Sequence, residues 1–246
     1  MNNRRRKSTA KDPIAHSGVL LVDKPAEWTS FDVVNFVRRF GFKKVGHCGT
    51  LDPAATGLLV LVLGRATRLS QQLSGQDKAY EGILEIGTTT DSQDGDGKVL
   101  ETADWGAVTE DQINETFAKF ADITEQLPPM VSAKKIGGKA LYKYHRKGEV
   151  VEREPRPVVI HELRVNAISL PTVDFFVHCG KGFYVRTLCH DIGQSLGCGG
   201  FLKRLHRTRS GRFDVANAID IETLRGWSKD DVLAHRIPLE SAVNMV

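Results

Sequence analysis

Apolar residues recur at helical spacing in several segments of the chain. A first helix is predicted to begin at Thr29 or Ser30, either of which can cap it, and to stop at Gly41. Its predicted apolar face consists of Phe31, Val34, Val37 and Phe40. A second helix begins after Thr109, which can form a capping box with Gln112. The same spacing predicts two further helices over residues 184–196 and 230–235.

Strands are predicted where residues alternate in polarity or form short apolar runs. The most apolar run, Gly57–Leu63, is flanked by glycine and predicts a central strand. Other strands are expected over residues 18–22, 78–87, 161–170, 173–179 and 201–208. Several of these follow one another through short turns instead of alternating with helices. The order therefore favours an α+β fold with a mixed or antiparallel sheet over a doubly wound parallel one.

The organisation of the chain is expected to be simple. Residues 1–16 are polar and basic without periodicity, which predicts a flexible tail; residues 17–215 form one domain, and residues 216–246 a short helix and tail without a separate domain. The longest apolar run is far too short to span a bilayer, and no apolar segment follows the basic N-terminus as in a secretory signal. A cytoplasmic location is expected.

Charge is mildly positive, with 34 Lys and Arg against 30 Asp and Glu and a net charge of +4. This balance is compatible with a polyanionic partner but does not require one. Basic residues gather in two places, between Arg4 and Lys11 and between Lys203 and Arg212. Each cluster is either a solvated surface or a set of phosphate contacts, and the local pattern leaves both interpretations open.

Common signatures of metal, nucleotide and nucleophile chemistry are missing. No two of the four cysteines have C-x-x-C spacing, and the acidic turn Asp91–Gly97 does not fit a calcium loop. No dinucleotide motif, P-loop, zincin or serine-hydrolase pattern occurs either. These observations favour a reaction that uses neither a cofactor nor a bound metal.

Three segments are candidates for chemistry. Asp52 follows a glycine-punctuated loop that leads into the predicted central strand, where it either caps a turn or presents a rigid carboxylate. Residues Gly180–Arg186 form a tight turn, which is either a ligand-binding turn or a structural hairpin with a surface arginine. Tyr80 lies on a predicted strand, where packing is the commoner role of tyrosine.

Taken together, five segments in the same order resemble the TruB-type tRNA pseudouridine synthases. The resemblance covers about residues 18–211, and its most specific segment is Gly-His-Cys-Gly-Thr-Leu-Asp-Pro-Ala-Ala-Thr-Gly at residues 46–57. The other four segments lie within residues 23–31, 77–97, 126–148 and 182–199. The short C-terminus departs from longer relatives, which carry a C-terminal RNA-binding domain.

The resemblance implies a pseudouridine-synthase fold, with a central mixed or antiparallel sheet, flanking helices and an RNA-binding cleft in the catalytic domain. It implies that uridine 55 in the T-loop of tRNA is isomerised without a cofactor by Asp52, with Arg186 paired to that carboxylate. Tyr80 would stack on the extruded base and help move the C5 proton. The implied substrate-binding residues are His47, Tyr184, Leu202, Lys24 and Arg68.

Pseudouridylation needs one ionised carboxylate, which attacks C1′ or C6 or takes a proton from C2′; the sequence does not choose among these routes. The expected partner is the tRNA T-arm, bound by a monomer without an obligate protein partner. Two alternatives are a tRNA-binding or folding module without catalysis, and a relative that acts in a guide-RNA complex. The second alternative expects a C-terminal RNA-binding domain.

Overall fold

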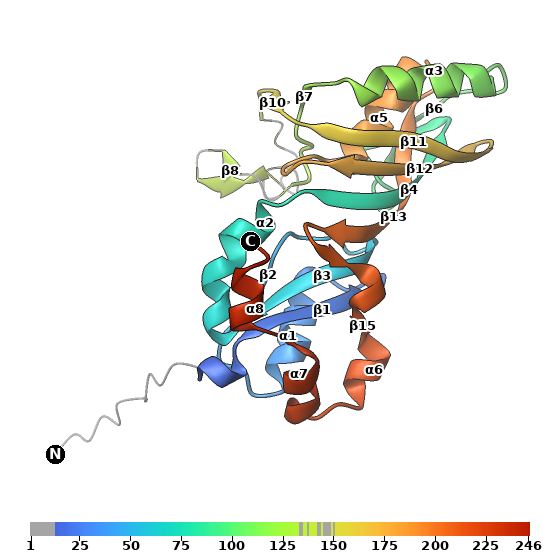
Figure 1. Cartoon of the computed structure of the whole chain (residues 1–246). Coiled ribbons are helices and arrows are strands. Elements are labelled where there is room, and N and C mark those ends of the chain that lie inside the picture. Colours follow the sequence, from blue (N-terminus) through green and yellow to red (C-terminus); the bar gives the residue numbers. More distant parts are fainter. Residues whose placement is uncertain (1–12, 133–134, 137, 142–143, 145–148, 150) are drawn as a thin grey trace. The chain divides into compact units, whose positions relative to one another are not determined.

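The computed structural model describes residues 13–132, 135–136, 138–141, 144, 149 and 151–246. Most of the predicted N-terminal tail, residues 1–12, lies outside the described residues. The chain forms two compact units. Unit 1 contains the chain up to Pro53, Gly57–Ser74 and Arg212–Val246, and unit 2 contains Ala54–Thr56 and Gly75–Gly211. Figure 1 shows the elements of both units, coloured along the sequence.

A mixed sheet forms the centre of unit 1. β1 (Gly18–Lys24) pairs antiparallel with β3 (Thr56–Leu63) along its whole length, and β2 (Val45–His47) pairs with β3. The C-terminal segment adds β15 (Ile219–Asp220) parallel to β1 and β16 (Ile237–Pro238) antiparallel to it. Residues after 215 thus complete the sheet of unit 1.

Both faces of this sheet are buried, which explains why β1 and β3 are apolar at nearly every position. Leu20, Leu59 and Leu61 face a core with α1 (Ser30–Arg38), α6 (Ile221–Arg225) and α7 (Lys229–His235). The opposite face packs against the remaining short elements of unit 1, and its core contains residues of η2, α2, α8 and β14. Those short elements are η1 (Ile14–His16), η2 (Gly64–Leu69), α2 (Ser70–Ser74), β14 (Phe213–Asp214), η3 (Val215–Asn217) and α8 (Leu239–Val243).

The first helix is confirmed, but one residue of its predicted face was wrong. Thr29 is the N-cap and forms a reciprocal capping box with Asp32. The buried face includes Ser30, Val33 and Val37, whereas the side chain of Phe31 is 58% exposed. Because the inward turn of Ser30 sets the rotation of the helix, Phe31 lies roughly a quarter turn away and points to solvent.

An antiparallel sheet forms the centre of unit 2, in the order β11–β12–β4–β13. Its strands are β11 (Ile160–Ser169), β12 (Thr172–Cys179), β4 (Lys78–Ile86) and β13 (Gly200–Ser210). Two helices, α3 (Glu110–Ala121) and α5 (Val185–Ser195), contribute to one core with these strands and cover one face of the sheet (Figure 1). The predicted strands, both helices and the Thr109 capping box are confirmed.

Close approach of backbones fixes α5 on the sheet. A Cβ atom added at Gly193 would lie 2.2 Å from the backbone nitrogen of Gly200, so only glycine fits where α5 crosses β13. The contact lies in the last turn of α5 and fixes that end of the helix against β13. Three short strand pairs complete unit 2: β5 (Thr88–Thr90) with β6 (Val99–Thr102), β7 (Glu125–Gln126) with β10 (Arg156–Pro157), and β8 (Lys135–Ile136) with β9 (Lys139–Ala140).

Within the described part of the chain, no helix is both long enough and apolar enough to cross a bilayer.

Candidate active site

Asp52 lies in the loop between β2 and β3 of unit 1, and its side chain is half-buried. The loop begins with a hydrogen bond from the Cys48 amide to the Val60 carbonyl, 2.8 Å long, which extends the pairing of β2 with β3. Gly49 follows with φ of +97°, a conformation that only glycine adopts without strain. The loop is therefore anchored to the central strand directly before Asp52.

Two buried side chains hold the backbone on either side of Asp52. Ser30 Oγ accepts a hydrogen bond from the Leu51 amide at 2.9 Å and donates one to the Leu51 carbonyl at 3.1 Å. Lys24 Nζ donates to the Pro53 carbonyl at 3.0 Å. Residues 51 and 53 are thus both fixed, and Asp52 stands between them on a backbone with little freedom to move.

Lys24 is fully buried, with 0% of its surface exposed. Besides the Pro53 carbonyl, its ammonium group donates to the carbonyls of Pro25 at 2.9 Å and Trp28 at 2.6 Å. A buried ammonium group must be surrounded by acceptors, and these three carbonyls supply them. The sequence pointed to Lys24 as a substrate-binding residue, and the structure shows that it joins the turn after β1 to the loop that carries Asp52.

Arg186 in unit 2 is also buried, at 5% exposure, in the first turn of α5. Its guanidinium donates to the Ser92 carbonyl at 2.9 Å and to the Val131 carbonyl at 2.7 Å. It also lies 3.5 Å from Oδ2 of Asp94. Arg186 therefore joins two segments that are distant in sequence to the start of α5.

The neighbours of Arg186 tie the same segments together. Gln126 exchanges two hydrogen bonds with the backbone of Tyr184, at 2.8 and 3.0 Å. Thr187 Oγ1 donates to Gln93 Oε1 at 2.9 Å. The Leu202 amide donates to the Gln93 carbonyl at 3.1 Å. The start of α5, the acidic turn and β13 thus form one hydrogen-bonded cluster.

The remaining predicted site residues occupy separate positions. Tyr80 lies in β4 beside Val177 of β12, and its ring packs half-buried against the core of unit 2. His47 lies half-buried in β2, and Arg68 is exposed in η2. The predicted residues form two groups. Lys24, His47, Asp52 and Arg68 belong to unit 1, and Tyr80, Tyr184, Arg186 and Leu202 belong to unit 2.

The two groups belong to different units, so the pairing of Asp52 with Arg186 stays a prediction. Sequence reasoning missed three residues that shape these groups: Ser30, Asp94 and Gln126. From the sequence, Ser30 was considered as a helix cap. In the structure its side chain instead holds Leu51 in the loop that carries Asp52. Gln126 precedes Leu127-Pro128-Pro129, and its partner Tyr184 lies 58 residues away, so no local pattern indicated its role.

Burial raises the pKa of the thiols in unit 2. The pKa of Cys179 is raised to about 12, mainly because the group is buried, and that of Cys189 is well above its ordinary value for the same reason. Burial also raises the pKa of Cys198. These thiols stay protonated at neutral pH and are poor nucleophiles. Among the described residues of unit 2, thiolate chemistry is therefore not favoured at these positions.

Basic residues of β13 differ in what they offer to a polyanion. Arg207 is buried at 1% exposure, so its guanidinium is not presented at the surface. Lys203 forms an ion pair with Glu85. Arg204, Arg209 and Arg212 are exposed. The phosphate-contact interpretation of this cluster therefore applies to three of its five members.

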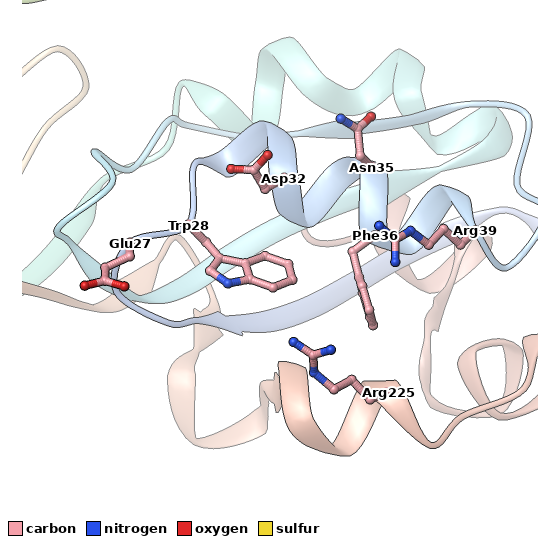
Figure 2. A pocket seen from close by; sticks show the side chains of 7 residues that line it. All are labelled: Glu27, Trp28, Asp32, Asn35, Phe36, Arg39 and Arg225. Carbon is pink, nitrogen blue, oxygen red and sulfur yellow. The ribbon is translucent and has the colours of Figure 1, made fainter.

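A cavity of about 470 Å³ lies on α1 and α6 in unit 1 (Figure 2). Trp28 and Phe36 meet edge to face there, with ring centroids 5.8 Å apart, and the Arg39 guanidinium lies 5.7 Å from the Phe36 ring centroid. Glu27, Asp32, Asn35 and Arg225 complete the lining. Asp32 is already engaged by Thr29. None of the residues predicted from the sequence lines this cavity.

Two family models of known proteins together match residues 37–244 of the chain. Residues 37–185 match the family model described as TruB family pseudouridylate synthase (N terminal domain). Residues 186–244 match the model described as tRNA pseudouridylate synthase B C-terminal domain. The relatives include a protein named tRNA pseudouridine synthase B from Opitutus terrae, 46% identical over 92% of this chain and 94% of its own. Another with that name, from Chlamydia pneumoniae, is 46% identical over 82% of this chain and 86% of its own.

Solved structures support the same fold. A chain in the crystal structure of a Cbf5–Nop10–Gar1 complex is 29% identical to this chain, with a TM-score of 0.73. A chain in the crystal structure of the archaeal box H/ACA sRNP Nop10–Cbf5 complex is 27% identical, with a TM-score of 0.68. They are covered over 64% and 65% of their lengths respectively, so this chain spans less than two thirds of each. The predicted α+β pseudouridine-synthase fold is confirmed.

Proposed function

The chain belongs to the TruB family of pseudouridylate synthases, and we propose that it acts on uridine 55 in the T-loop of tRNA with Asp52 as its catalytic carboxylate. It is an isomerase that converts a uridine of tRNA into pseudouridine. The reaction breaks the N1–C1′ bond, turns the uracil, and joins C5 to C1′. Atoms and electrons balance within the nucleotide, so no donor or oxidant enters the reaction.

The clamped loop around Asp52 is the observation that carries the role of this residue. A carboxylate that reacts with the ribose or the base must be held in one place while the uracil turns. The two hydrogen bonds between Ser30 and Leu51, and the one that Lys24 donates to Pro53, give Asp52 such a support. The carboxylate attacks C1′ or C6 or takes a proton from C2′, and each of these routes requires it ionised and near the ribose.

Lys24 is assigned a supporting role in this proposal. Because its ammonium group is buried among three carbonyls, it orients the loop that carries Asp52 on the substrate-binding side of the site. Arg68, which is exposed in η2, contacts the RNA backbone. His47 supports the nucleotide pocket from β2, next to the Asp52 loop.

The residues of unit 2 complete the proposed site. Tyr80 stacks on the extruded base and helps move the C5 proton, and Tyr184 and Leu202 line the nucleotide pocket. Arg186 favours the ionised form of Asp52 and orients it. The hydrogen bonds of Arg186 to the Ser92 and Val131 carbonyls hold its guanidinium in a defined direction for this task.

The proposed target, uridine 55 in the T-loop, determines that the base must be extruded and which part of the tRNA is bound. A stacked uridine is not accessible to a carboxylate, so the target nucleotide leaves its stack at a cost of a few kcal/mol. We propose that the T-arm is the bound part of the tRNA, and that the enzyme acts in the cytoplasm as a monomer without an obligate protein partner. Residues 17–215 would carry the catalytic residues, while residues 216–246 complete the sheet of unit 1.

The target is tested by tritium release from a tRNA transcript labelled at C5 of uridine, followed by mapping of pseudouridine. We expect release of about one equivalent, with the product at position 55. A transcript with cytidine at position 55 should release none. Tritium release with pseudouridine elsewhere would keep the chemistry and contradict the target. Tight tRNA binding without release would contradict the enzymatic proposal and favour a binding module.

A further inference from the structure

Three metal-ligating side chains, none of them among the residues proposed for pseudouridylation, meet at one end of the unit 2 sheet. They are Asp77, His161 and His178, called the Asp77 cluster below. One ligand atom of each lies within 4.8 Å of those of the other two. His161 Nε2 is 2.9 Å from Asp77 Oδ2, and the two imidazole centroids are 4.7 Å apart.

The strand register explains why these side chains converge. Asp77 directly precedes β4, and His178 in β12 pairs with Ala79, so both belong to the same face of the sheet. β11 carries a register shift between Ile160 and Glu162, with His161 as the extra residue. A bulge re-aims the side chain of its extra residue. In this way His161 is directed toward its neighbours on β12 and β4.

We propose that the Asp77 cluster binds one divalent transition-metal ion, with Zn²⁺ as the probe. Two imidazole nitrogens and a carboxylate oxygen form a common three-ligand set for such ions, and the fourth position is left to water or another ligand. Tetrahedral zinc places its ligand atoms about 3.4 Å apart. The 2.9 Å separation of His161 and Asp77 is close to this value, and their side chains are 39% and 48% exposed, which leaves them room to adjust.

Charge and backbone support are suited to a cation. Glu162, opposite His178 in the register, adds negative charge beside the cluster. The backbone of Asp77 is fixed because its carbonyl accepts a hydrogen bond from the Gly211 amide at 2.8 Å.

A bound ion would connect β11, β12 and the start of β4. Because unfolding separates these strands, an ion held by all three binds the native state in preference to the unfolded one. β4 leads from this end to Tyr80, three residues beyond Asp77. The site is therefore expected to stabilise unit 2 and not to take part in the isomerisation.

The test uses the full-length protein after removal of metal with a chelator, titrated with Zn²⁺ by calorimetry at pH 7. The wild type is compared with His161→Ala and Asp77→Asn, which change exposed side chains. His235→Ala is the matched control, because His235 is an exposed histidine of unit 1. Co²⁺ serves as a second probe, since its visible spectrum reports the coordination geometry and the donor atoms.

We expect one high-affinity Zn²⁺ per chain in the wild type and in His235→Ala, and binding weaker by at least about tenfold in His161→Ala and Asp77→Asn. Zinc should raise the thermal midpoint of the wild type but not that of His161→Ala. Equal binding by the wild type and His161→Ala would overturn the proposal, as would a Co²⁺ spectrum with thiolate charge-transfer bands. A wild type without a high-affinity site would overturn it as well.

Discussion

The two units each contain a buried cation that holds backbone carbonyls, but the two cations differ in what they join. Lys24 donates to carbonyls within 29 residues, and the most distant of them flanks Asp52. Arg186 joins segments 55 and 94 residues away and also lies beside a carboxylate. Lys24 thus shapes one loop, whereas Arg186 connects parts of unit 2 that are far apart in sequence.

This difference shows two ways in which a buried cation can position a proposed active-site residue. In unit 1 the two residues that flank the proposed catalytic side chain are held: Lys24 donates to the Pro53 carbonyl, and Ser30 holds Leu51. In unit 2 the guanidinium that we expect to act on Asp52 is itself the group that holds the structure. A substitution at Lys24 should therefore remove the support of the Asp52 loop and leave the arginine that acts on the Asp52 carboxylate in place. A substitution at Arg186 should remove both the support of unit 2 and the positive charge expected to act on Asp52.

The largest expected effect is that of Arg186→Ala. Removing the guanidinium leaves the Ser92 and Val131 carbonyls without this donor and Asp94 without this partner, so the free energy of unfolding should fall by about 3–5 kcal/mol. Urea unfolding of the variant measures this. The control Arg164→Ala removes an exposed ion pair with Glu162 and should cost no more than about 1 kcal/mol. Equal losses in the two variants would contradict the account of Arg186.

Lys24→Met should have the next largest effect. Methionine keeps much of the volume but removes the donor to three carbonyls, and a loss of about 2–4 kcal/mol in unfolding free energy is expected. The single-turnover rate should fall as well, since the Pro53 carbonyl is released, while tRNA affinity changes little. Lys98→Met, at an exposed lysine, is the control. A variant with weaker tRNA binding and an unchanged rate would indicate a substrate contact instead.

Ser30→Ala and Thr29→Ala compare two neighbouring residues at the start of α1, of which only Ser30 holds the Asp52 loop. The variant loses both hydrogen bonds to Leu51, so the unfolding free energy should fall by about 1–2 kcal/mol and the single-turnover rate should also fall. Thr29→Ala removes the adjacent helix cap at about 1 kcal/mol but leaves Leu51 held. If the two variants lowered the rate equally, the role of Ser30 in positioning Asp52 would be refuted.

The smallest expected effect is a pH dependence that differs between the units. In unit 1, hydrogen bonds from Thr29, Thr223 and Ser228 lower the pKa of the capping carboxylates Asp32, Asp220 and Asp231. Their stabilisation is present above the unfolded carboxyl pKa, about 4, and is lost as the pH falls through the lowered values.

In unit 2, burial raises the pKa of Asp191, with His190 acting against it. Its contribution has the opposite sign: it is present below the unfolded pKa and is lost as the pH rises through the raised value. Hydrogen exchange at about pH 2, 3, 4, 5 and 6 should therefore show Asp220→Asn with a flatter response in unit 1 below pH 4, and Asp191→Asn with a flatter response in unit 2 above pH 4. A flattening of both units by either variant would contradict this assignment.

Much of the fold was predictable because local chemistry decides it. The capping box of Thr109 and Gln112, the glycine-flanked strand at Gly57–Leu63 and the helix before Gly197 follow from residues close in sequence. Phe31 was misplaced because apolar spacing alone does not fix the rotation of a helix. That rotation depends on Ser30, whose partner Leu51 lies 21 residues away.

The sequence predicts a set of candidate site residues, but it does not predict the contacts that hold them. The segment around Asp52 is specific enough to indicate the family and its chemistry. The burial of Lys24 was not predictable, since a lysine followed by proline is usually solvated and its three acceptors are backbone atoms. Asp94 was considered as a calcium ligand, and its contact with Arg186 spans 92 positions that no local pattern connects.

The most direct test of the central claim is the single-turnover rate of tritium release by Asp52→Asn at saturating enzyme, with the tRNA dissociation constant measured on the same preparation. Asp230→Asn, at an exposed aspartate of unit 1, is the matched control. The account predicts a rate lower by at least about a thousandfold in Asp52→Asn, with affinity within about threefold of the wild type and of Asp230→Asn. An Asp52→Asn protein that releases tritium at the wild-type rate would contradict it.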